Sequence, residues 1–172
     1  MRTCTAICLV FLMAHSCSNP YAGYAVYEGI YYKLLKIGEQ DKYARSGEYV
    51  TIDVTCKTMR DSVFFSGVCR FGLTRPEFPG AFAHCFALIG EQDSAEFIVP
   101  ATSGFFEEAL KTPPPEYLHS SEEIKIAVRL REIQSREAFL RERQTFLRWA
   151  ADAGEHERHL LREYVRNAKI DV

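Results

Sequence analysis

The clearest pattern along the chain is an alternation of apolar and polar residues over 48–58 (EYVTIDVTCKT). A period of two predicts a strand with one buried face. After a tight connection at Arg60 and Asp61, the run 63–71 (VFFSGVCRF) predicts the returning strand. Gly67 inside this run predicts a bulge or a bend. The two runs together predict a β-hairpin.

Shorter apolar runs flank this hairpin. Three further strands are expected, at 29–36 (GIYYKLLK), 94–99 (SAEFIV) and 123–133 (EIKIAVRLREI). The last of them reads as a half-buried edge or outer strand because its charged residues alternate with its apolar ones. Pro79 precedes a short apolar helix at 80–88 (GAFAHCFAL). Residues 101–121 predict a loop with a helical turn at 105–110.

The period becomes helical after Ser135. Four apolar residues recur seven apart in this region, at Phe139, Phe146, Ala153 and Leu160. The sequence therefore predicts an amphipathic helix that continues to about Ala168. Gly154 interrupts the pattern, so we expect the helix to kink or break there.

The first seventeen residues differ from the rest of the chain. Arg2 is followed by an unbroken apolar run at 6–14 (AICLVFLMA), which is typical of an export signal and too short to cross a bilayer as a helix. A buried core helix is the weaker alternative. Cys17 stands where bacterial lipoprotein signals place the lipidated cysteine, with plain secretion and a free Cys17 as the alternative. Residues 18–28 then predict a tether.

Composition narrows the classes of function. The chain has 172 residues, 21 basic and 23 acidic side chains and a formal net charge of -2, which argues against nucleic acid as a partner. Cys56, Cys69 and Cys85 lack the spacing of a metal or redox site, and we interpret them as small buried apolar residues. The five histidines are scattered, and no glycine-rich phosphate loop is present. We therefore expect no metal and no cofactor.

The order of these elements resembles that of the FKBP-type peptidyl-prolyl cis-trans isomerases. The strings that carry the resemblance are GIYYKLLKIGE, YVTIDVTCKTMRDSVFFSG, FPGAFAHCFALIGEQDSAEFIVP and EEIKIAVRLREI. The resemblance implies an α+β fold in which a curved antiparallel sheet wraps around one short helix, with a C-terminal amphipathic helix added. The expected domain organisation is a signal peptide at 1–17, a tether at 18–28, an FKBP-like domain at 29–133 and a helical extension at 134–172.

The resemblance also assigns substrate-pocket residues. Phe64 matches the phenylalanine of the family's pocket wall, Phe78 matches the apolar residue whose backbone amide holds the substrate, and Ile126 matches the aromatic residue of the last strand. These positions keep their apolar character.

Other pocket positions depart from the family's pattern. Val54 replaces a tyrosine, Phe65 replaces an aspartate and Ala81 replaces the tryptophan of the pocket floor, where the adjacent Phe82 partly refills the space. The family's tyrosine-bearing loop has become TSGF, in which Phe105 supplies the ring. The catalytic residues are left unassigned, and Phe64 and Phe82 are equally well explained as core.

Prolyl isomerisation needs no nucleophile, because the barrier of about 18–20 kcal/mol comes from amide resonance. An apolar, dry pocket that holds the twisted amide lowers it. We expect an isomerase of weak activity that assists the folding of proline-containing exported polypeptides. The alternative is a non-catalytic FKBP-like chaperone or binding module of an envelope assembly.

The C-terminal helix resembles the connector in lipoproteins of the Bacteroidetes type, some of which serve gliding motility. Cys17 predicts a lipid anchor, and in lipoproteins of this type the absence of an acidic run after it indicates the periplasmic side of the outer membrane. A protein partner or a dimer is expected to form through the C-terminal helix, with Trp149 as a probe on it.

Overall fold

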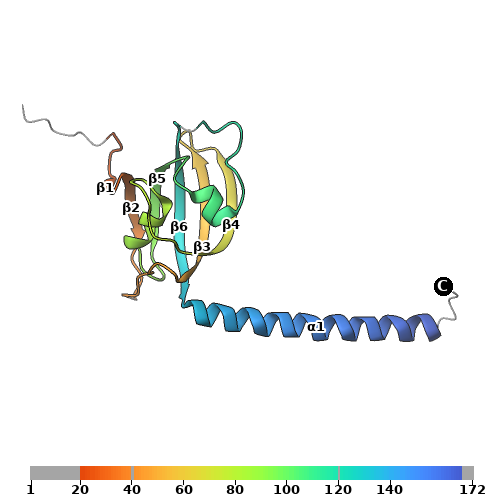
Figure 1. Ribbon diagram of the computed structural model, residues 1–172. Coiled ribbons are helices and arrows are strands. Elements are labelled where there is room, and N and C mark those ends of the chain that lie inside the picture. The colour runs from red at the N-terminus through yellow and green to blue at the C-terminus, as the bar shows by residue number, and fades with distance from the viewer. Residues whose placement is uncertain (1–19, 40, 120, 168–172) are drawn as a thin grey trace, which may run out of the picture.

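A computed structural model describes residues 20–39, 41–119 and 121–167. The chain forms one six-stranded antiparallel sheet in the order β1-β2-β5-β6-β3-β4. The strands are β1 (Ala25–Tyr27), β2 (Ile30–Lys36), β3 (Tyr49–Thr58), β4 (Val63–Gly72), β5 (Ser94–Pro100) and β6 (Glu123–Gln134). Two short helices accompany the sheet, and a long helix leaves the end of β6 and projects away from it (Figure 1). The signal peptide predicted at 1–17, with Cys17, lies outside the described residues.

The short helix between β4 and β5 packs on the inner face of the sheet. It is η1 (Phe82–Ala87), a 3₁₀-helix in which Phe82 and Phe86 are fully buried. Alternate residues of β3, from Val50 to Cys56, supply the sheet's side of the same core. The predicted hairpin and the α+β arrangement of a sheet around one short helix are therefore confirmed. The predicted helical turn at 105–110 forms as one π-helical turn, η2 (Phe106–Leu110).

The last strand was expected at an edge, and this expectation was wrong. β6 lies between β5 and β3, in the interior of the sheet. An antiparallel sheet with one solvated face gives its central strands the same polar and apolar alternation as its edges. On the solvated face, the guanidinium Nη2 of Arg131 lies 2.6 Å from Oδ1 of Asp53. The ammonium Nζ of Lys125 lies 2.9 Å from Oδ1 of Asp61. The charged residues of β6 therefore pair with β3 and with the β3–β4 turn.

The bulge predicted at Gly67 lies elsewhere. Gly67 pairs regularly with Val54, and the register shifts instead where Cys56 faces Phe65 and Lys57 faces Val63. Gly67 is small for another reason, since a Cβ there would lie 3.3 Å from the ring of Phe65. The glycine therefore makes room for an aromatic ring on its own strand.

The C-terminal helix α1 (Arg136–Asn167) is continuous, so the break expected at Gly154 does not occur. One glycine costs a helix interior only about 1 kcal/mol relative to alanine. Hydrogen bonds on both sides of it outweigh that cost. The start of the helix is fixed to the domain by the ring of Phe139, which stacks on Tyr49 with 3.8 Å between centroids.

Two backbone features at the N-terminal side were not predicted from the sequence. β1 lies within the segment expected to be a tether, and a two-residue turn joins it to β2. Glu28 and Gly29 of that turn have positive φ values of 46° and 82°, as a type I′ hairpin turn requires. The turn is docked on the core side, because Gly80 N donates a hydrogen bond to Glu28 O.

A buried carboxylate joins two turns at the other end of β2. Asp93, of which 6% is exposed, accepts hydrogen bonds from Gly38 N at 2.6 Å and Gly90 N at 2.7 Å. Hydrogen bonds to a charged acceptor contribute about 1.5–3 kcal/mol each. The turn after β2 is thereby held against the turn that precedes β5.

We predict that Gly29→Ala destabilises the domain more than Gly47→Ala. Both glycines have positive φ, which costs an alanine about 1–2 kcal/mol. A Cβ on Gly29 would also lie 3.0 Å from Gly80 N, whereas one on Gly47 meets nothing within 4 Å. Urea unfolding of both variants checks the order. Equal losses would contradict the close packing of the β1–β2 turn.

Candidate functional site

Three segments meet at one end of the sheet. The register pairs Pro100 at the end of β5 with Glu123 at the start of β6, and Ile124 with Thr58 at the end of β3. The loop after β5 and the segment before β6 are joined by a hydrogen bond from Ala101 N to Glu122 O. The start of η1 is tied to the same loop, because Phe82 N donates to Ser103 O at 2.7 Å. This end of the molecule therefore collects loops on a rigid frame.

Six phenylalanine rings pack between these loops and the sheet. They form a chain of contacts with centroid separations from 5.0 Å, between Phe82 and Phe105, to 6.2 Å, between Phe64 and Phe106. We call this set the aromatic cluster: Phe64, Phe71, Phe82, Phe86, Phe105 and Phe106. Phe82 and Phe105 have no exposed surface, so their rings fill the space between η1 and the sheet.

The residues expected to line a substrate pocket separate into buried and accessible sets. Those that are buried in the core are Val54, Ala81, Phe82, Phe105 and Ile126. Those that keep accessible surface are Phe64, Phe65 and Phe78.

The accessible residues lie at different places. Phe64 contacts Phe106 within the aromatic cluster. Phe65 lines a separate hollow between β4 and η2, together with Ala109 and Leu110. Phe78 is 45% exposed in the loop before η1. Whether any of these side chains contacts a prolyl substrate stays a prediction.

Ser103 is a candidate residue that the sequence analysis missed. Its hydroxyl is fully buried and makes no hydrogen bond within the described part of the chain. An unsatisfied buried polar group costs about 1–3 kcal/mol. The residue sits in the loop after β5, two positions before the buried Phe105. A lone serine in a polar string carries no signal by which the sequence could have identified it.

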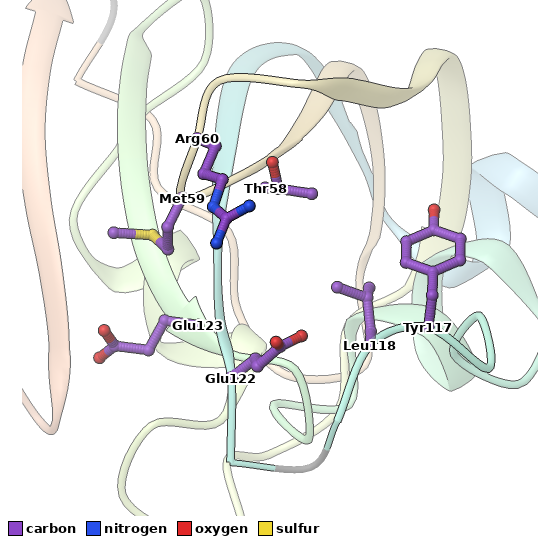
Figure 2. A pocket seen from close by; sticks show the side chains of 7 residues that line it. All are labelled: Thr58, Met59, Arg60, Tyr117, Leu118, Glu122 and Glu123. Carbon is purple, nitrogen blue, oxygen red and sulfur yellow. The ribbon is translucent and has the colours of Figure 1, made fainter.

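A surface hollow opens between the β3–β4 turn and the segment before β6 (Figure 2). Its volume is ≈ 340 Å³, and its lining residues are Thr58, Met59, Arg60, Tyr117, Leu118, Glu122 and Glu123. Leu118 also belongs to the core that contains Phe82 and Phe105. The apolar wall of the hollow is therefore continuous with the core.

Hydrogen bonds fix the polar rim of this hollow. Thr58 Oγ1 accepts from Ser62 N, which holds the β3–β4 turn. The Tyr21 hydroxyl donates to the Glu123 carboxylate, and this hydrogen bond, with burial, raises the pKa of Tyr21 to about 12. Burial and a hydrogen bond to Glu96 likewise raise the pKa of Tyr24 to about 12. Both tyrosines therefore stay neutral near pH 7 and act as donors.

The three cysteines of the described region are free and buried, as predicted. Burial raises the pKa of Cys56 to about 12 and that of Cys85 well above its usual range. Neither thiol forms the thiolate that nucleophilic chemistry needs near neutral pH. Residues 20–39, 41–119 and 121–167 also contain no group of three His, Cys, Asp or Glu side chains placed to hold a metal ion.

We predict that Cys56 and Cys85 of the native protein resist alkylation by iodoacetamide at pH 8. The raised pKa keeps both thiols protonated, and burial excludes the reagent. Peptide mapping by mass spectrometry should show modification at both positions only after unfolding in guanidinium chloride. Rapid labelling of native Cys85 would contradict its place in the core.

No family model matches the chain, and no curated protein matches it. Among solved structures, the fold is similar to that of FkpA from Escherichia coli, with a TM-score of 0.53 and 11% identity over 67% of this chain. The matched part spans 54% of the FkpA chain. The three FKBP domains of wheat FKBP73 give a TM-score of 0.47 and 17% identity over 62% of this chain and 45% of theirs. The likeness to FkpA shows that the fold is FKBP-like.

Proposed function

We propose that this chain is an FKBP-type prolyl isomerase of low activity that binds proline-containing segments of exported polypeptides. One observation carries the proposal: in an FKBP-like fold, the segments at one end of the sheet line a hollow whose apolar wall, Leu118, belongs to the same buried core as Phe82 and Phe105. A prolyl ring needs an apolar wall, and Leu118 and the exposed ring of Tyr117 offer one.

The expected weakness of catalysis has a physical reason. Lowering the barrier to rotation requires that the twisted amide sit in a dry, apolar site. Phe82 and Phe105 occupy the corresponding space with their own rings, and the hollow beside them is rimmed by Arg60, Glu122 and Glu123. A substrate bound at this rim keeps much of its hydration. The site therefore binds proline-containing segments but accelerates their isomerisation only weakly.

Ser103 supplies the polar group that a twisted carbonyl needs. Its unpaired hydroxyl is the donor in the loop where the family's tyrosine is missing. Because this hydroxyl is fully buried, a substrate reaches it only after a local rearrangement, so that the active form of the site is a minor population. A small competent fraction lowers the apparent activity in proportion.

We predict that Ser103→Ala lowers prolyl isomerisation and raises stability. Removing the unpaired hydroxyl should raise the free energy of unfolding by about 1 kcal/mol. Thr102→Ala, at the exposed neighbouring position, is the matched control and should change neither quantity. Exchange NMR on a proline peptide and urea unfolding of the full chain give the two readouts. A wild-type rate equal to that of buffer would remove the catalytic claim.

A non-catalytic chaperone or envelope binding module is the second candidate. The complete burial of Phe82 and Phe105 favours it, because a pocket filled in every conformer leaves only the rim hollow for binding.

The two candidates share a prediction about binding. Tyr117→Ala should weaken the binding of an unfolded, proline-containing polypeptide, whereas Tyr43→Ala, which removes an exposed ring elsewhere, should not. Fluorescence anisotropy of a labelled peptide measures both variants. Loss of binding with no wild-type isomerisation supports the module, and equal binding by both variants would exclude the hollow as the site.

The cellular setting is a separate part of the proposal. The apolar run at 6–14 and Cys17 support export and a lipid anchor on the periplasmic side of the outer membrane. Among the described residues, no helix combines the length and the apolarity needed to cross a membrane. Metabolic labelling with a palmitate analogue tests the anchor. Label that survives in Cys17→Ala would exclude this residue as the attachment point.

A further inference from the structure

The helix α1 exposes a long apolar stripe. From residue 140 to residue 166 its side chains are exposed, apart from the partly covered Gly154 and Val165. At 1.5 Å per residue the helix is about 48 Å long, and it projects from the sheet as a rod (Figure 1). Helices in proteins draw most of their stability from packing of an apolar face against another part of the structure. We therefore expect the exposed apolar stripe of α1 to pack against a binding partner.

Two charges interrupt the stripe, and their placement is symmetric. The residues that follow one another at helical spacing on this side are Phe139, Arg143, Phe146, Ala150, Ala153, Glu157, Leu161 and Tyr164. Arg143 lies seven residues before Ala150, and Glu157 lies seven residues after it. Neither side chain forms an ion pair within the described ranges of the chain, although other charges near the start of α1 do.

We propose that α1 pairs with α1 of a second copy of this chain, in an antiparallel arrangement centred on Ala150. That arrangement places each Arg143 opposite Glu157 of the other copy, so both interruptions of the stripe become ion pairs. A parallel pairing in register would instead set arginine against arginine and glutamate against glutamate. Like charges placed together across an interface oppose association. The charge pattern thus selects both the occupant and its direction.

The sizes of the side chains agree with this register. Pairing centred on Ala150 sets Phe146 of one copy opposite Gly154 of the other, because each lies four residues from the centre. A Cβ at Gly154 would meet nothing within 4 Å, so the surface there is open. Small residues at the centre let two helices approach closely, and the large ring fills the space above the glycine. The glycine expected to break the helix acquires a packing role.

The domain also provides a surface against which the C-terminal part of the second copy's α1 can pack. A hollow of ≈ 390 Å³ lies between β4 and the first turns of α1. It is lined by Arg70, Phe139, Glu142, Arg143 and Phe146. In the centred register, Leu161 of the other copy lies opposite Phe139, at this hollow. Its apolar lining and the Leu161 side chain are complementary.

Charge reversal tests the pairing directly. We expect the full chain to sediment as a dimer and Arg143→Glu and Glu157→Arg each to weaken dimerisation by about tenfold or more, since each variant opposes like charges. The double reversal, or an equimolar mixture of the two single variants, should restore the dimer. Arg148→Glu and Glu155→Arg, on the opposite face of the helix, are the matched controls and should leave the dimer unchanged.

Each other outcome overturns the proposal. A wild-type chain that sediments as a monomer at micromolar concentrations would exclude a second copy as the occupant. Single reversals that leave the dimer intact would indicate a parallel pairing or another interface. A double reversal that stays monomeric would exclude the Arg143–Glu157 contact, provided that circular dichroism shows the helix content of the wild type. These readouts do not depend on isomerase activity.

Discussion

The contact between η1 and the sheet depends on aromatic rings meeting edge to face. Phe86 of η1 contacts Phe71 of β4 with 5.7 Å between ring centroids, and Phe82 contacts Phe105 at 5.0 Å, with interplanar angles of 72° and 76°. Such pairs add about 0.5–1.5 kcal/mol to the burial of the rings themselves. Because η1 is a short 3₁₀-helix without a side-chain cap, it has little stability of its own. The rings therefore determine where the helix lies.

The same rings limit the chemistry of the molecule. The rings that secure η1, among them Phe82, Phe86 and Phe105, are fully buried and leave no accessible surface at this place. The apolar surface that lines the hollow comes instead from Tyr117 and Leu118. The buried hydroxyl of Ser103 remains as a polar group in an apolar setting. The low activity proposed above rests on this arrangement.

The sequence predicted where the strands and helices lie along the chain better than it predicted which strands pair with one another. The alternation in β3 and the apolar run of η1 have local causes, so both could be located from the residues alone. The central place of β6 depends on pairing with strands distant in sequence, which its own alternation does not encode. β1 was missed because Glu28 is an unusual residue at a positive φ.

The candidate site was harder to anticipate. Phenylalanines at 64, 82 and 105 look alike in a sequence whether they line a pocket or fill it, and only packing distinguishes the two. Ser103 stands out only through its missing hydrogen bond. The hollow at Tyr117 and Leu118 arises where segments far apart in the sequence come together. None of these features leaves a periodic signal.

The length of α1 sets the distance between the two domains of the proposed dimer. In the antiparallel pair the two domains lie at opposite ends, with the helix starts at Arg136 about 42 Å apart at 1.5 Å per residue. A fully extended polypeptide covers that separation with about 13 residues. On the function and the dimer proposed above, a client with two proline-containing stretches spaced at least this widely would engage both domains at once. Bivalent capture then raises the overall affinity by avidity, without any new contact.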